Sequence, residues 1–193
     1  MRSTNHLSIA AFLLTAIAVS TASLAIAGGG HSHGKASFNI ALEANLIKVS
    51  GDIPLEAVAG FERVPRSDAD TAKVKAAALL LRNADKLFTF SEAARCKSKQ
   101  TDLNSTAMST ELLGGPAKAV TSSVNKDVHI DIDAAWIFQC EKPEALKSIT
   151  VNLFDDFKGL KVIQVSVVGA KVTTGGKRQL GGRLTASSRK VTW

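Results

Sequence analysis

The stretch VHIDIDAAWIFQC, residues 128–140, decides the fold of this chain. Apolar side chains alternate along it with other residues, which is the pattern of a β-strand with one buried face. The apolar face consists of Val128, Ile130, Ile132, Ala134, Trp136, Phe138 and Cys140. The opposite face carries His129, Asp131 and Asp133. Side chains two positions apart on a strand lie about 6.5 to 7 Å apart on one face, so this strand presents an imidazole and two carboxylates to solvent.

The segment before residue 28 has the features of a secretory signal peptide. Arg2 precedes an apolar run over residues 7–19, and Ala25-Ile26-Ala27 is a small-x-small cleavage site. At about 1.5 Å per residue the run reaches about 20 Å, short of the roughly 30 Å that a membrane-spanning helix must cross. We therefore expect residues 1–27 to be cleaved. The expected product is an exported domain of 166 residues (193 minus 27), 28–193, without a membrane span.

Two cysteines, Cys96 and Cys140, follow the signal peptide. In an oxidising compartment outside the cytoplasm, a pair of cysteines is bonded more often than free. We therefore predict a disulfide that makes the segment after Cys96 a neighbour of the central strand. The alternative is two unrelated buried thiols. A redox-active pair is disfavoured because the two cysteines form no C-x-x-C motif.

Patterns on either side of the central strand predict an α+β fold. Ser67 and Asp70 have the spacing of a helix-capping box, so we expect the main helix to begin there and run to about Phe88. Alternating or Val- and Ile-rich runs predict further strands at residues 35–49 with a turn at Asn45, 96–103, 149–154, 161–168 and 183–193. Turns are expected at the glycine pairs 175–176 and 181–182. The predicted architecture is an antiparallel sheet covered by one main helix and tied by one disulfide.

Composition excludes several classes of function. The formal net charge is +7 at pH 7, and +6 without the single charge of Arg2, but the basic residues are scattered and the chain has no tyrosine. Without a basic stripe interleaved with aromatic residues, we expect no nucleic-acid partner. The sequence has no G-x-S-x-G, no H-E-x-x-H and no glycine-rich phosphate loop. We therefore expect that the protein is not an enzyme.

Residues 28–34, GGGHSHG, are predicted to form a flexible arm, because three consecutive glycines hold no fixed conformation on their own. His31 and His33 lie on this arm. A histidine pair separated by one residue and flanked by glycine binds divalent metals readily. The alternative is an incidental polar tail. Imidazole suits zinc and copper alike, so the residues alone do not choose between these two metals.

The order and spacing of these features resemble the ZrgA-type family of zinc-regulated, zinc-binding periplasmic proteins. The residues that carry the resemblance are His31-Ser32-His33-Gly34, Gly60-Phe61-Glu62 with Pro65, Ala84-Asp85-Lys86-Leu87-Phe88, Cys96, His129-x-Asp131-x-Asp133-x-x-Trp136-x-Phe138-x-Cys140 and Leu153-Phe154-x-x-Phe157-x-Gly159-Leu160. The resemblance implies a small α+β protein that holds zinc in the periplasm and feeds or buffers an uptake system. Family members often carry a histidine-rich insertion before the central strand, whereas residues 104–125 of this chain contain no histidine.

Our leading hypothesis is one zinc site shared by the arm and the central strand. His31 and His33 would fold over the strand and join His129 and either Asp131 or Asp133. Three or four such ligands satisfy tetrahedral zinc at about 2.0 to 2.2 Å.

Several alternatives stay open at this point. The arm and the strand could each bind metal separately, copper could replace zinc, or the polar face of the strand could be merely solvated. The rival function is a metal-independent structural or interaction protein of the cell envelope.

Overall fold

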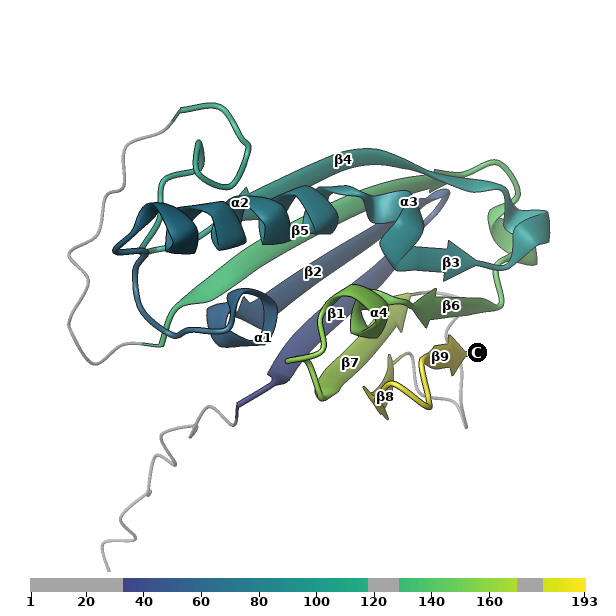
Figure 1. The fold of residues 1–193 in the computed structure, drawn as a ribbon. Coiled ribbons are helices and arrows are strands. Elements are labelled where there is room, and N and C mark those ends of the chain that lie inside the picture. Colours follow the sequence, from purple (N-terminus) through teal and green to yellow (C-terminus); the bar gives the residue numbers. More distant parts are fainter. Residues whose placement is uncertain (1–32, 118–128, 170–178) are drawn as a thin grey trace, which may run out of the picture. The chain divides into compact units, whose positions relative to one another are not determined.

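The computed structural model describes residues 33–117, 129–169 and 179–193 (Figure 1). The strands are β1 (Lys35–Glu43), β2 (Leu46–Pro54), β3 (Phe88–Phe90), β4 (Cys96–Asn104), β5 (Asp131–Cys140), β6 (Ser148–Val151), β7 (Val162–Gly169), β8 (Gln179–Leu184) and β9 (Lys190–Thr192). The helices are α1 (Leu55–Ala59), α2 (Asp68–Arg82), α3 (Ala84–Leu87) and α4 (Leu153–Asp156), and the 3-10 turns are η1 (Glu92–Ala94) and η2 (Pro143–Ala145).

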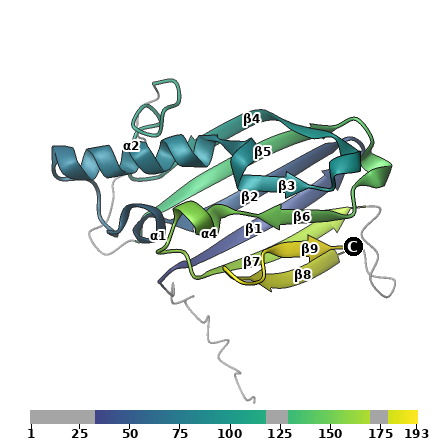
Figure 2. The same cartoon turned by 45° about the vertical axis from the view of Figure 1, so that its right-hand side comes forward.

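Two sheets form the framework of the fold. The larger has the strand order β4-β5-β2-β1-β7-β8, and the smaller has the order β3-β6-β9. The helices and the smaller sheet lie over one face of the larger sheet in both views (Figures 1 and 2). The α+β class and the single main helix, α2, are confirmed. The larger sheet is mixed, because β1 and β7 run parallel while its other pairs are antiparallel.

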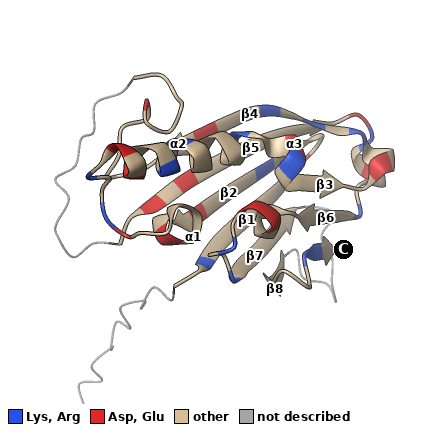
Figure 3. Ribbon diagram, in the orientation of Figure 1, with Lys and Arg blue, Asp and Glu red and all other residues tan. Residues whose placement is uncertain are grey.

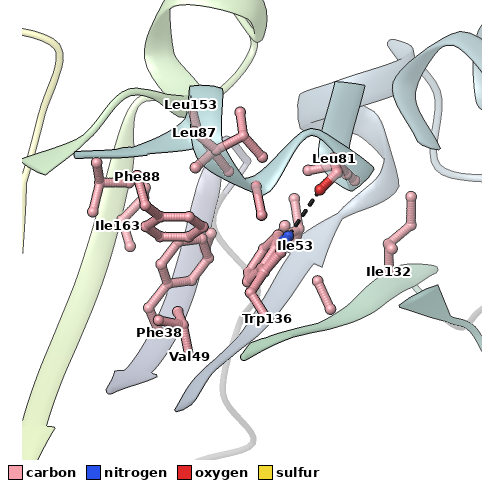
Figure 4. Packing of buried hydrophobic residues seen from close by; sticks show 14 of the residues in the cluster. Phe38, Val49, Ile53, Leu81, Leu87, Phe88, Ile132, Trp136, Leu153 and Ile163 are labelled. Carbon is pink, nitrogen blue, oxygen red and sulfur yellow. Dashed lines mark hydrogen bonds between the residues drawn. The ribbon is translucent and has the colours of Figure 1, made fainter. Parts of the chain in front are cut away.

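The central strand is confirmed as β5, with its apolar face in the core. Trp136 is completely buried and donates its indole N–H to the Leu81 carbonyl over 2.8 Å (Figure 4). The Phe88 ring packs edge-on against Trp136 at 5.0 Å between centroids. Edge-to-face contacts of this kind stabilise beyond the burial of area alone. The hydrogen bond satisfies the one polar atom that such a ring brings into the core.

The main helix begins where the capping box predicts, since Ser67 accepts a hydrogen bond from the Asp70 amide at 3.1 Å. The predicted end at Phe88 is wrong. Asn83, with φ −83° and ψ 67°, leaves the helical conformation and separates α2 from the single turn α3. Phe88 then begins β3, where its ring reaches the aromatic core. Core packing of Phe88 thus overrides the continuous helical pattern of the sequence.

The predicted hairpin in residues 35–49 is confirmed as β1 and β2, with Glu43 paired to Leu46 across the turn. The disulfide between Cys96 and Cys140 is also confirmed, and these cysteines are direct partners in the β4–β5 ladder. None of the helices in the described part of the chain has the length and apolar content needed to cross a lipid bilayer.

The C-terminal third departs from the predicted strand pattern in three places. The run at 149–154 divides into β6 and α4, because Leu153 and Phe154 bury their side chains from a helical turn. Gly181 and Gly182 lie inside β8 rather than in a turn, paired with Ser166 and Val165 of β7. The predicted last strand, 183–193, is the end of β8, a turn and β9. The other glycine pair, 175–176, lies outside the described residues.

Candidate metal centre

One end of the larger sheet brings His33 and the start of the central strand together. β2 ends there at Pro54, β5 begins there at Asp131, and these two residues are partners in the ladder. β1 begins at the same end, and α1 follows β2 directly. In an antiparallel pair, the end of one strand lies beside the start of its partner. Segments that are about 75 to 100 residues apart in the sequence therefore meet at this end of the sheet.

Four side chains converge at this end, and we call them the His/Glu cluster: His33, Glu56, Glu62 and His129. Glu62 lies between the histidines, with Oε1 2.8 Å from His33 Nδ1 and Oε2 3.5 Å from His129 Nδ1. Glu56 Oε1 lies 3.7 Å from His33 Nδ1. Around a tetrahedral zinc ion with bonds of about 2.0 to 2.2 Å, ligand atoms lie about 3.3 to 3.6 Å apart. The separations in the cluster are close to those of a coordination shell.

The cluster lines a small hollow that is open to solvent. His33, Glu56 and Glu62 each offer one ligand atom, and these atoms lie within 4.8 Å of one another. His129 and Asp131 line the same hollow. The His33 side chain is 72% exposed and that of Glu56 only 20%, so His33 lies on the solvent side of the hollow while Glu56 of α1 forms its floor. An ion can therefore enter without opening of the core.

Gly34 fixes the chain just before β1 beside α1. Its amide donates a hydrogen bond to Glu56 Oε1, and its carbonyl accepts from the amides of Lys161 at 2.7 Å and Val162 at 3.0 Å. Gly34 has a φ of +70°, and a Cβ there would lie 2.5 Å from the Gly159 carbonyl oxygen. Only glycine meets both requirements without strain. Gly34 therefore holds the residue before it, His33, at the cluster.

The loop that carries Glu62 is anchored to the start of α2. Asp70 accepts hydrogen bonds from Arg63 Nη1 at 2.6 Å and from the Arg66 amide at 3.0 Å. The Arg63 guanidinium also lies over the Phe61 ring, 5.0 Å from its centroid. The hydrogen bond from Arg63, followed by that from Arg66, lowers the pKa of Asp70 to about 2. Arg63, the residue after Glu62, is thus held to α2 by a charge-assisted hydrogen bond, and its guanidinium covers Phe61, the residue before Glu62.

Of the residues that the sequence nominated, the structure brings three to the hollow: His33, His129 and Asp131. Asp133 lies two residues further along β5, paired in the ladder with Asp52 rather than lining the hollow. Partial burial, followed by the charges of Asp52 and Asp131, raises the pKa of Asp133. His31 lies outside the described residues.

Glu56 and Glu62 were not among the nominated ligands. Glu56 follows Pro54 in a short helix whose apolar residues suggest only packing, and an acidic residue in the first turn is ordinary there. Glu62 belongs to the motif Gly60-Phe61-Glu62 that carries the family resemblance, and that motif was the one available signal. Neither glutamate has a histidine within four positions, so spacing along the chain could not associate them with a metal site.

Two comparisons with known proteins bear on this site. A protein-family model described as ZrgA family zinc uptake protein matches residues 30–193. The matched region includes the whole His/Glu cluster and both cysteines. No curated protein matches the chain at a significant level.

Proposed function

The chain belongs to the ZrgA family of zinc uptake proteins, and from this premise we propose that its His/Glu cluster binds one zinc ion. The observation that carries the proposal is the position of Glu62 between two histidines from distant segments, at 2.8 and 3.5 Å. Such contacts between exposed groups stabilise a fold little. Binding of one zinc ion by these side chains would account for their convergence, whereas a contribution to fold stability does not.

The donor set suits zinc. Two imidazoles and two carboxylates supply four ligands, which completes the tetrahedral geometry of a closed zinc site. The two glutamates neutralise the charge of a divalent ion, and Asp131 stands at the edge of the hollow as a further oxygen donor. A closed set leaves no position for a reactive water, which favours a binding role over hydrolysis. Copper is the second metal that these ligands suit.

The cellular role that follows is zinc acquisition or buffering in the periplasm. The signal-peptide features of residues 1–27 support export, and the exposed cluster supports reversible exchange of the ion with an uptake system. One candidate metal group among the described residues, together with a 104–125 segment that contains no histidine, favours delivery of individual ions over bulk storage.

Calorimetric titration of zinc, and separately of copper, into protein purified after export and stripped of metal tests the proposal. We expect one zinc ion per chain at micromolar affinity or tighter. His129→Ala and Glu56→Gln should each weaken binding, while Glu92→Gln, an exposed glutamate on η1, should leave it unchanged. Equal affinity in all three variants would place zinc elsewhere. No heat and no rise in melting temperature with either metal would favour the metal-independent envelope role.

A further inference from the structure

The disulfide end of the larger sheet carries two adjoining hollows that the zinc site does not use. Leu46, where β2 begins, and Cys140, where β5 ends, line the first hollow. The zinc site lies at the other end of the same strands. The eight residue steps from Leu46 to Pro54 separate the two ends by roughly 26 Å at 3.3 Å per residue.

The first hollow is apolar, and we call it the apolar hollow. It measures about 120 Å³, and its walls include Leu42, Leu46, Leu146 and Trp193. An apolar cavity of roughly 150 Å³ accepts a benzene ring. The apolar hollow therefore has room for one ring or the end of one alkyl chain. It is too small for the tails of a phospholipid.

The second hollow is positively charged, and we call it the basic hollow. Arg95, Lys97 and Lys99 line it together with one carboxylate, Glu141. Glu141 pairs with Arg95 at 3.3 Å. Within the described ranges, no ion pair joins Lys97 or Lys99 to an acidic side chain. Figure 3 shows basic segments along β4, the strand that carries both lysines. Lys97 and Lys99 are therefore available to an anionic group.

Asn45 and Cys140 line both hollows, so the two hollows are neighbours at this end of the larger sheet. The disulfide holds the strand that carries Lys97 and Lys99 against the strand that ends at the apolar hollow. An apolar recess directly beside unpaired cations is complementary to a molecule with an apolar end and an anionic head. A purely apolar ligand would not use the two lysines, and a purely anionic ligand would not use the apolar hollow.

We propose that the disulfide end of the protein binds a free anionic amphiphile, such as a short fatty-acid carboxylate. Its apolar end occupies the hollow beside Trp193, and its carboxylate is held by Lys97 and Lys99. Lys97 and Lys99, which form no ion pair within the described residues, indicate that the ligand is anionic. The volume of the apolar hollow, about 120 Å³, indicates that its apolar part is a single short chain. Each half of the ligand therefore contributes to affinity.

Titration of decanoate below its micelle concentration into the exported protein, followed by tryptophan fluorescence and calorimetry, tests this assignment. Trp136 is completely buried, so the expected change in emission comes from Trp193 and should disappear in Trp193→Phe. Decanol and inorganic phosphate supply the two halves of the ligand separately. We expect each to bind at least tenfold more weakly than decanoate.

The charge contribution is tested with Lys97→Ala/Lys99→Ala, which should weaken decanoate binding at least tenfold. The matched control Lys73→Ala/Lys75→Ala removes two exposed lysines from α2 and should not. Zinc affinity should be the same in both double variants, which separates this proposal from the zinc site. Equal decanoate affinity in both, or phosphate binding as tight as decanoate, would overturn the proposal. So would binding only to anionic phospholipid vesicles or only to an acidic peptide.

Discussion

His33 Nδ1 lies 2.8 Å from Glu62 Oε1, although one residue precedes β1 and the other follows α1. The contact brings His33 to the same carboxylate that faces His129 at the hollow above Glu56. In the proposed zinc site, this carboxylate is the group that both imidazoles contact.

Replacement of this carboxylate should therefore be the most harmful change to zinc binding. Loss of a group that merely supports a ligand typically weakens metal affinity about 10- to 100-fold, and loss of a ligand should cost at least as much. We expect Glu62→Gln to fall in or beyond this range. Glutamine has nearly the same shape as glutamate, so the substitution should affect folding little. A thermal melt without metal would check this. Unchanged zinc affinity in calorimetry would remove Glu62 from the site.

Gly34→Ala should loosen the arm and lower both stability and zinc affinity. A non-glycine residue held in a strained conformation costs about 1 to 3 kcal/mol, and here the new Cβ would also meet the Gly159 carbonyl at 2.5 Å. Gly60→Ala is the matched control, because Gly60 has a similar φ of +83° but no atom within 4 Å of the added Cβ. Urea unfolding should show a larger loss for Gly34→Ala. An equal loss in the two variants would mean that positive φ alone accounts for the effect.

The Asp70 anchor should make stability depend on pH in acid. Its pKa in the fold, about 2, lies below the ordinary value of 3.8. The unfolded chain therefore binds more protons between these values, and stability rises with pH there. The contribution is complete above about pH 4 and is lost as pH falls through about 2. Urea midpoints measured from pH 2 to 5 should fall less steeply in Asp70→Asn than in the wild type.

Asp68→Asn serves as the control for this pH dependence, because Asp68 lies exposed in the same first turn of α2. Both substitutions remove a negative charge near the start of the helix, so their shared effect on the helix dipole cancels in the comparison. Asp68→Asn should keep the wild-type slope. Identical slopes for the wild type and Asp70→Asn would contradict the role of Arg63 and Asp70 as an anchor.

Removal of the disulfide should lower stability without abolishing zinc binding. Cys96 and Cys140 are 44 positions apart, and a bridge of this span stabilises a domain by about 2 to 4 kcal/mol. The proposed zinc site lies at the opposite end of β5. We expect the double Cys→Ala variant to unfold at lower urea with zinc affinity within about threefold of the wild type. A parallel collapse of zinc affinity at temperatures where the variant is folded would show that the two ends are coupled.

The elements that depend on near neighbours along the chain could be predicted from the amino-acid sequence. Period-two alternation identified β5, the capping box placed the start of α2, and the expectation of export to an oxidising compartment predicted the pairing of the two cysteines. The sequence also nominated His33, His129 and Asp131, because their residue types are metal ligands wherever they occur. Local patterns of this kind reflect backbone geometry and burial on one face, which a short window of residues contains.

Which of these residues meet depends on contacts between distant segments and could not be predicted from local patterns. Glu56 and Glu62 join the site because β2 ends beside the start of β5 and α1 turns the chain back over that point. Asn83 interrupts the helix because Phe88 packs against Trp136, and Gly181 and Gly182 extend as a strand because β7 pairs with them. Each of these outcomes depends on a contact between segments distant in sequence. The free energy of such a contact is gained only when folding brings the two segments together.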